Sequence, residues 1–485
     1  MTQDRNIVIV GGGFAGTTLA RRLEPMLPQG LRIVLVSEES YTTFNPMLAE
    51  VVGAAVFPEH VVAPIRPMLR TSRFVMGRVA GVDFGRRVLT ASTLAGLVEI
   101  DYEHLVLAFG TRANLDLVPG LAARALPLKL VGDAMFIRNR VLQRIARIEL
   151  ETDAVVRRRL GHFVVIGGGF SGVEVAGTLA DFLHGALRYY PRVRADELRV
   201  TVLEGADRLL LELPESLARA ALRSLMQRRI EVRLKTRAAS VDGDGVRLES
   251  GEFLEAANVV CTIGTRPNPL AEQLGLPLQR GRIVTAPDLS VPGPSQVWAL
   301  GDCALVRNHA GPATAPAGPE RPVVHAPPTA QFAVAEARAL ARNIAARIAG
   351  RPTRPFGHVS RGMMATTGHL RGVAQVFGLR LSGLPAWLLW RAYYLMQMPT
   401  LGRKVRIWVE WTWAMFFAAD VTHLRFTRTH EADADAPARR PEALVAAQPA
   451  RVAAQPARVA APAARIAAPT QRVATQTAPA AAQTP

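Results

Sequence analysis

Cysteine is scarce in this 485-residue chain. Only Cys261 and Cys303 occur, and they form neither a C-x-x-C nor a C-x4-C spacing. The scarcity excludes a cysteine-rich metal site and a redox disulfide between sequence neighbours, and it favours a reducing compartment. We therefore expect no metal centre.

A long uncharged apolar run is also missing. The aromatic stretch within 380–430 never reaches 18 uncharged residues. Five charged side chains interrupt it: Arg391, Arg403, Lys404, Arg406 and Glu410. This pattern argues against a membrane-spanning helix.

Acidic residues are the scarcer charge type. The chain has 58 Lys and Arg against 40 Asp and Glu, a net charge of +18. This excess suits solubility, and because no basic helix with interleaved aromatics occurs, we expect no nucleic-acid partner. An anionic membrane surface is the better candidate. Met1 leads through five polar residues into a strand, so no signal peptide is expected.

Near its beginning the chain has a glycine-rich motif, "IVIVGGGFAGTTLA". The apolar run 7–10 is typical of a buried parallel strand. Three glycines follow in G-x-G-x-x-G spacing: Gly11, Gly13 and Gly16. The first permits a tight turn, the second admits a pyrophosphate, and the third lets a helix, here about 15–24, pack on the strand. A second strand, 32–37, leads to Glu38, whose carboxylate would accept ribose hydroxyls.

The motif recurs as "FVVIGGGFSGVEVAGTLA". Its glycines are Gly167, Gly169 and Gly172. A helix over about 173–187 follows, and the next strand ends at Glu204, the second ribose acceptor. Two fingerprints predict two dinucleotides, one that stays bound and one that comes and goes.

Two further turns, "AFGT" and "TIGT", echo each other. They place Gly110 beside the first dinucleotide and Gly264 beside the second. The stretch "VWALGDCA" (297–304) reads as a buried strand ending in Gly301 and Asp302. This Asp would bond a ribityl hydroxyl or a pyrophosphate-linked group, although a capping turn is the alternative.

The last 180 residues change character twice. Thr329 in "PPTAQ" predicts the N-cap of a helix that ends at Gly350. Five of the six tryptophans lie between Trp387 and Trp413, among basic residues. This mixture favours a helix lying in a membrane interface over about 380–420, with a dimer interface or a cap on the core as alternatives. In the interface, the tryptophans would lie among headgroups, and Arg391, Arg403, Lys404 and Arg406 would meet anionic lipid.

A seven-residue unit then recurs from Val445. Each copy contains a proline, which excludes a continuous coiled-coil helix. We therefore predict a disordered Ala/Pro/Gln/Arg repeat tail over 431–485.

The order of these motifs resembles the type II NADH dehydrogenases over about residues 4–430. The carriers are the two fingerprints, "YTTFNPMLAEVVGA", "GVE", "LGDCA", "PPTAQ" and the aromatic-basic C-terminus. The fold class predicted is α/β, with two Rossmann-like domains and a C-terminal membrane-associating helical segment. The FAD-binding domain comprises 1–120 and 266–380, the inserted NAD(H)-binding domain 121–265, and the C-terminal segment 381–430.

The resemblance implies non-covalent FAD, NADH and a membrane quinone, with two electrons transferred and no proton pumped. It assigns catalytic roles to Glu174 and Gln331. It implies a peripheral protein on the cytoplasmic face of the membrane, and a homodimer is one alternative for its assembly. The chain departs from the pattern at Ala335, where many members carry a second glutamine; Glu336 beside it is expected to be a surface charge.

Three rival functions stay open. A sulfide:quinone reductase needs a redox cysteine pair beside the flavin, and Cys261 and Cys303 do not look like partners. A ferredoxin- or rubredoxin-type reductase would not need the tryptophan-rich basic segment. An NAD(H)-sensing binding protein with residual reductase activity would keep the same folds.

Overall fold

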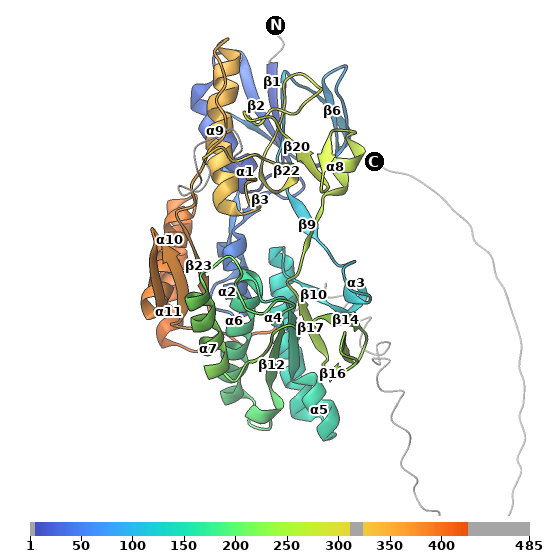
Figure 1. Ribbon diagram of the computed structural model, residues 1–485, viewed down its shortest axis with the longest axis vertical. Helices are drawn as coiled ribbons and strands as arrows, with labels where there is room; N and C mark the ends of the chain where they lie inside the picture. The colour runs from blue at the N-terminus through green and yellow to red at the C-terminus, as the bar shows by residue number, and fades with distance from the viewer. Residues whose placement is uncertain (1–4, 311–323, 425–485) are drawn as a thin grey trace, which may run out of the picture. The chain divides into compact units, whose positions relative to one another are not determined.

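The first glycine motif follows strand β1 (Arg5–Val10), which lies inside a seven-stranded sheet of the computed structural model (Figure 1). The structure describes residues 5–310 and 324–424. The strand order is β21 (Val297–Ala299), β8 (His104–Leu107), β1, β2 (Leu31–Ser37), β5 (Arg73–Asp83), β6 (Val88–Thr93) and β7 (Gly96–Asp101). The first five strands pair in parallel, and β5, β6 and β7 form an antiparallel meander.

A second parallel sheet follows the second glycine motif. Its order is β10 (Leu126–Pro127), β17 (Asn258–Cys261), β11 (His162–Ile166), β12 (Arg199–Leu203) and β13 (Glu231–Arg233). Helices α4 (Val131–Leu150), α6 (Phe170–Ala186) and α7 (Glu215–Gln227) belong to this part. An antiparallel sheet of β14 (Ala238–Val241), β15 (Gly245–Leu248) and β16 (Phe253–Glu255) accompanies it. The α/β prediction with Rossmann-like parallel sheets is confirmed.

Two short strands carry the chain between these sheets. Strand β9 (Thr111–Ala113) leaves the first sheet, and β18 (Thr265–Pro267) returns to it. They pair antiparallel with each other, between the two larger sheets (Figure 1). Gly110 and Gly264, with φ of +65° and +68°, precede them. The echo between "AFGT" and "TIGT" therefore marks two adjacent crossings.

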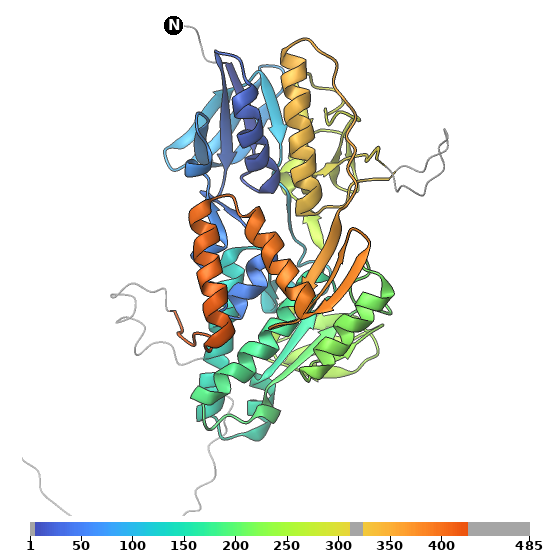
Figure 2. The same cartoon turned by 90° about the vertical axis from the view of Figure 1, so that its left-hand side faces the viewer.

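Helices α1 (Phe14–Leu23) and α9 (Ala330–Ile348) pack side by side on the first sheet (Figure 2). The predicted N-cap of α9 is confirmed, because the Thr329 side chain accepts a hydrogen bond from the backbone N–H of Phe332. Helix α6 begins at Phe170, three residues earlier than predicted, because Gly169 is its N-cap.

The C-terminal part contains a sheet that the sequence patterns did not indicate. Its strands β23 (Gly362–Thr366), β24 (Gly372–Val376) and β25 (Leu379–Gly383) are antiparallel. Helices α10 (Leu384–Gln397) and α11 (Leu401–Phe416) follow and lie side by side (Figure 2). None of the helices in the described ranges has the length and apolarity required to cross a membrane. The predicted repeat tail, 431–485, lies outside the described residues.

Candidate functional site

A cleft of about 2160 Å³ brings together segments that lie far apart in the sequence. Its lining includes the first glycine loop, the turn at Gly110, the Gly301–Asp302 pair, and the N-terminal turn of α9. Glu174 of α6 and the end of α10 complete it. Eight of the predicted site residues line this cleft: Gly11, Gly13, Glu38, Gly110, Glu174, Gly301, Asp302 and Gln331.

The first glycine loop has the backbone geometry expected of a dinucleotide fingerprint. Gly11 has φ +114°, and a Cβ there would collide with the carbonyl of Ala108. A Cβ on Gly16 would collide with the carbonyl of Gly11, so the third glycine allows close packing of helix on strand. At Gly13, by contrast, no atom lies within 4 Å of the Cβ position. Gly13 is also the N-cap of α1, where free N–H groups favour an anion.

The second loop repeats this geometry. Gly167 has φ +111°, and a Cβ on Gly172 would collide with the carbonyl of Gly167. Gly169 is open like Gly13 and is the N-cap of α6. The repeated motif therefore builds two equivalent turns, one at the carboxyl end of β1 and one at the carboxyl end of β11, both inside their sheets.

The acids at the two strand ends have different partners. Glu38 forms a 2.6 Å ion pair with Arg112, and both side chains are exposed. Glu204 accepts the N–H of Gly168 at 2.6 Å on one carboxylate oxygen and that of Ala206 at 2.8 Å on the other. Glu204 thus holds the second glycine loop, and each of its oxygens keeps a further lone pair for a ribose hydroxyl.

Glu336 is buried, so the expectation of a surface charge is wrong. Its Oε2 accepts the backbone N–H of Gly301 at 2.7 Å, and burial raises the pKa of the carboxyl to about 7. The reason is that Glu336 lies on the apolar face of α9 with Ala333, Leu340 and Ile344, which packs against the first sheet. The signal was present in the sequence, because Glu336 falls in that helical stripe at the i+3 position from Ala333.

Gln331 lies in the first turn of α9 and is half-buried. Its Oε1 accepts a hydrogen bond from the Ser360 hydroxyl at 3.2 Å, which orients the amide. Ala335, one turn further along, also lines the cleft. The position of the absent second glutamine is therefore an apolar part of the same wall.

Glu174 is buried at the edge of the cleft. Its Oε1 accepts the backbone N–H of Thr366 at 3.2 Å and the indole N–H of Trp390 at 3.1 Å. Burial raises the pKa of this carboxyl to about 8. Because α6 begins at Phe170, Glu174 lies in its second turn, not in the first turn as predicted. These contacts place it against strand β23 and helix α10.

Both cysteines are buried free thiols. The Cys303 sulfur contacts the carbonyls of Leu107 and Leu300, and burial raises its pKa to about 12. Burial also raises the pKa of Cys261. Neither thiol is among the described residues that line the cleft. Buried thiols with raised pKa values are poor nucleophiles, which disfavours sulfide chemistry here.

Arg391 is buried, so the prediction that it meets anionic lipid is wrong. Its guanidinium lies 3.7 Å from the ring centre of Trp387 and 4.9 Å from that of Trp411. Glu50 lies 3.6 Å from it. Burial lowers the pKa of Arg391 to about 10.

The tryptophans of the C-terminal segment divide into two groups. Trp387, Trp390 and Trp411 are buried, whereas Trp408 and Trp413 are more than half exposed. The side chains of the first group lie inside this part of the molecule. Only the second group is available to a partner.

An α/β protein with two dinucleotide fingerprints, the first of which lines a large cleft, has the features of the oxidoreductases that bind two dinucleotides. The family model for pyridine nucleotide-disulphide oxidoreductases matches residues 5–337, and the chain belongs to this family. It is similar to the type II NADH:quinone oxidoreductase Ndh of Mycobacterium tuberculosis, with 28% identity over 425 residues, 84% of this chain and 87% of that protein. The resemblance to type II NADH dehydrogenases is thus confirmed.

Two solved structures share the fold. NDH2 from Plasmodium falciparum in complex with NADH superposes with a TM-score of 0.79 at 18% identity, over 87% of this chain and all of that chain. The sulfide:quinone oxidoreductase of Aquifex aeolicus gives 0.65 at 16% identity over the same shares. Proteins with either activity therefore share this fold, so the residues of the site have to distinguish the two reactions.

Proposed function

We propose that this chain is an FAD-dependent NADH:quinone oxidoreductase. Hydride passes from NADH to FAD, and two electrons then pass to a membrane quinone, with no proton pumped. The observation that carries the proposal is the cleft that joins an open anion-binding glycine turn to Glu174 and Gln331. The flavin supplies the electron chemistry when bound, and the protein orients the reactants.

The first sheet and its cleft fit non-covalent FAD. The open position at Gly13 is a cradle that a side chain would fill, and it lies at the N-terminus of α1. Gly110 and the Gly301–Asp302 pair line the same cleft, and Glu38 lies at its outer end as the ribose acceptor. The FAD-binding region is then 1–120 with 266–380, in keeping with the parallel pairing of β21 with β8.

The second sheet fits NADH. Gly169 offers the pyrophosphate an open turn at the N-terminus of α6, and Glu204 offers oxygens to the adenine ribose. Gly167, Gly172 and Gly264 shape the loop around them. The NAD(H)-binding region is then 121–265.

We propose that Glu174 holds a proton next to the cofactors. Both of its described hydrogen bonds are accepted by Oε1, which leaves Oε2 as the oxygen that carries the proton. With a pKa raised to about 8, the carboxyl is mostly neutral at pH 7. A neutral carboxyl orients the nicotinamide or donates its proton as the acceptor is reduced.

Gln331 is the residue proposed to contact the quinone. Because the Ser360 hydroxyl donates to Oε1 of Gln331, the amide NH₂ group remains available as a donor to a quinone carbonyl. With Ala335 in the next turn, this hydrogen bond has no second glutamine to support it.

The exposed face of α10 and α11 fits an anionic membrane surface within about 380–420. Its apolar side chains are Leu388, Met396, Leu401, Val405, Trp408, Trp413 and Phe416. Arg403, Lys404 and Arg406 flank them. Apolar and aromatic groups bordered by cations suit an interfacial helix on the cytoplasmic face of the membrane. A homodimer would cover the same face and is the alternative.

Purified, FAD-loaded protein tests these assignments against their rivals. We expect NADH oxidation with a quinone analogue, slower oxidation with oxygen, and none that depends on sulfide. Sulfide-dependent quinone reduction would favour a sulfide:quinone reductase. Tight NADH binding without quinone turnover would favour an NAD(H)-sensing protein.

A further inference from the structure

Two adjacent residues of α10 reach two buried carboxylates. Trp390 donates its indole N–H to Glu174, and the next residue, Arg391, lies 3.6 Å from Glu50. Glu50 belongs to α2 (Leu48–Val52), which packs directly on α6, the helix of Glu174. All four side chains are less than one-tenth exposed.

We propose that Glu50 and Arg391 form a positioning pair for Glu174. The ionised Glu50 carboxylate, held by the Arg391 guanidinium, keeps the Glu174 carboxyl neutral and sets the pH at which it releases its proton. Neither residue of the pair touches a reacting atom. The inference rests on the proposed role of Glu174.

Arg391 is built to keep Glu50 charged. Burial raises the pKa of Glu50 above its ordinary value, and the Arg391 guanidinium opposes this rise, so the ion pair is what favours the charged form of Glu50. The guanidinium is fixed by the ring faces of Trp387 and Trp411 and donates to the Trp411 carbonyl at 3.1 Å. A cation fixed in this way offsets the cost of the buried charge.

Glu50 then acts on Glu174 through space. Its charge is one of the causes that raise the pKa of Glu174, after burial itself. A like charge in a water-poor region disfavours a second ionisation, by about one pKa unit or more at close range.

The other titratable groups around the pair do not replace it. Asp181, on α6, is paired with Arg228 at 3.0 Å. It also accepts a hydrogen bond from the backbone N–H of His369 at 2.5 Å. The imidazole of His369 has a lowered pKa through burial, and Tyr394 of α10 has a raised one through burial, so both are neutral near pH 7. Among these groups, Glu50 is the one whose charge contributes to the raised pKa of Glu174.

Infrared titration of the holoenzyme tests the pair directly. The C=O band of protonated Glu174 is identified by its loss in Glu174→Gln and is followed from pH 5 to 10. We expect wild type to titrate near pH 8 and Glu50→Gln about one unit or more lower. Glu50→Asp, which restores the charge, should return toward wild type. Unchanged titration in Glu50→Gln would overturn the proposal.

Two further variants keep the test decisive. If Glu50→Gln does not fold because Arg391 is left unpaired, the double variant Glu50→Gln with Arg391→Met removes both charges and should show the same acid shift.

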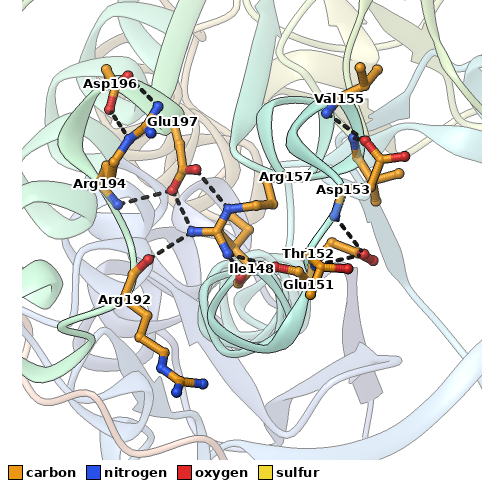
Figure 3. Close-up of polar contacts among 11 residues, drawn as sticks. Ile148, Glu151, Thr152, Asp153, Val155, Arg157, Arg192, Arg194, Asp196 and Glu197 are labelled. Atoms are coloured by element: carbon orange, nitrogen blue, oxygen red, sulfur yellow. Dashed lines mark hydrogen bonds and ion pairs between the residues drawn. The ribbon is translucent and has the colours of Figure 1, made fainter.

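The matched control is Glu197→Gln. Glu197 is a buried carboxylate held by Arg157 at 2.7 and 2.8 Å in another part of the fold (Figure 3). If the Glu174 band shifts equally in Glu197→Gln, the shift in Glu50→Gln reflects loosened packing and not the charge of Glu50. That result would overturn the proposal.

The same variants separate this inference from the proposed function. The alkaline limb of kcat for NADH with a soluble quinone should move with the band. A shifted band in a protein without NADH:quinone turnover would leave the pair intact and refute the function. Normal turnover with an unshifted band would refute the pair alone.

Discussion

The backbone N–H of Gly301 donates to Oε2 of Glu336 at 2.7 Å, across the junction between the end of the first sheet and α9. The bond fixes the turn that presents Asp302 to the cleft. We expect Glu336→Leu to leave this N–H unpaired, to lower the free energy of unfolding by about 1–3 kcal/mol and to reduce FAD content. Glu336→Gln retains an acceptor and should keep both. Thermal melting and flavin absorbance measure these effects, and full FAD content in Glu336→Leu would contradict them.

The same carboxyl predicts a pH dependence of stability. Its pKa is raised from 4.5 to about 7 in the folded state, so the folded protein binds more protons than the unfolded chain between these values. Its contribution is fully present below about pH 4.5 and is lost as the pH rises through 7. The stability of wild type relative to Glu336→Gln should therefore fall from pH 5 to pH 7, as measured by denaturant unfolding at each pH.

Gly13 is the position where FAD binding should be most sensitive to a side chain. Gly13→Val fills the open space at the N-terminus of α1 and should yield protein with little bound flavin. Gly185→Val is the control, because Gly185 is also uncrowded but does not line the cleft. A yellow Gly13→Val protein with one FAD per chain would refute the assignment.

Glu204 should select NADH over NADPH. Its carboxylate accepts ribose hydroxyls and repels a 2′-phosphate, and charge-assisted hydrogen bonds of roughly 1.5–3 kcal/mol correspond to about ten- to a hundredfold discrimination. In Glu204→Gln the ratio of kcat/KM for NADH to kcat/KM for NADPH should fall toward one. Equal use of both by wild type would refute the role of Glu204.

Membrane docking should depend on Arg406, which is exposed, and on Arg403 and Lys404, which are half-buried at the same face. Replacing Arg403, Lys404 and Arg406 together by Gln should abolish flotation with anionic liposomes and turnover of a lipid-embedded quinone, since each cation contributes about 1 kcal/mol near the surface. Soluble-quinone turnover should persist. If the wild-type protein does not float with anionic liposomes at low salt, the face is a subunit interface instead.

The exposed tryptophans provide an independent check on the same surface. Trp408→Ser with Trp413→Ser should weaken flotation at any salt concentration, because it removes apolar burial and leaves the charges in place. Trp387 is buried against Arg391, so replacing it should lower stability first.

The local parts of the fold could be predicted from sequence, and the tertiary parts could not. Glycine spacing, strand runs and the Thr329 cap are encoded within a few residues, and they were identified correctly. The pairing of Glu336 with Gly301 and the burial of Arg391 depend on which helix faces which sheet. Periodicity placed Glu336 in an apolar stripe, but charge alone favoured the surface; for Arg391, nothing in its neighbourhood indicated the Glu50 partner 341 positions away.

The antiparallel pairing of β9 with β18 makes the residues between them a detour with a common start and end. Its two junctions are hydrogen-bonded neighbours, so the length of the intervening 151 residues does not set the spacing of the strands of the first sheet. If the insert binds NADH as proposed, nucleotide preference becomes a portable property: a different insert, joined at 113 and 265, would meet the same crossing if it kept the surface of α6 that packs on α2 and β23.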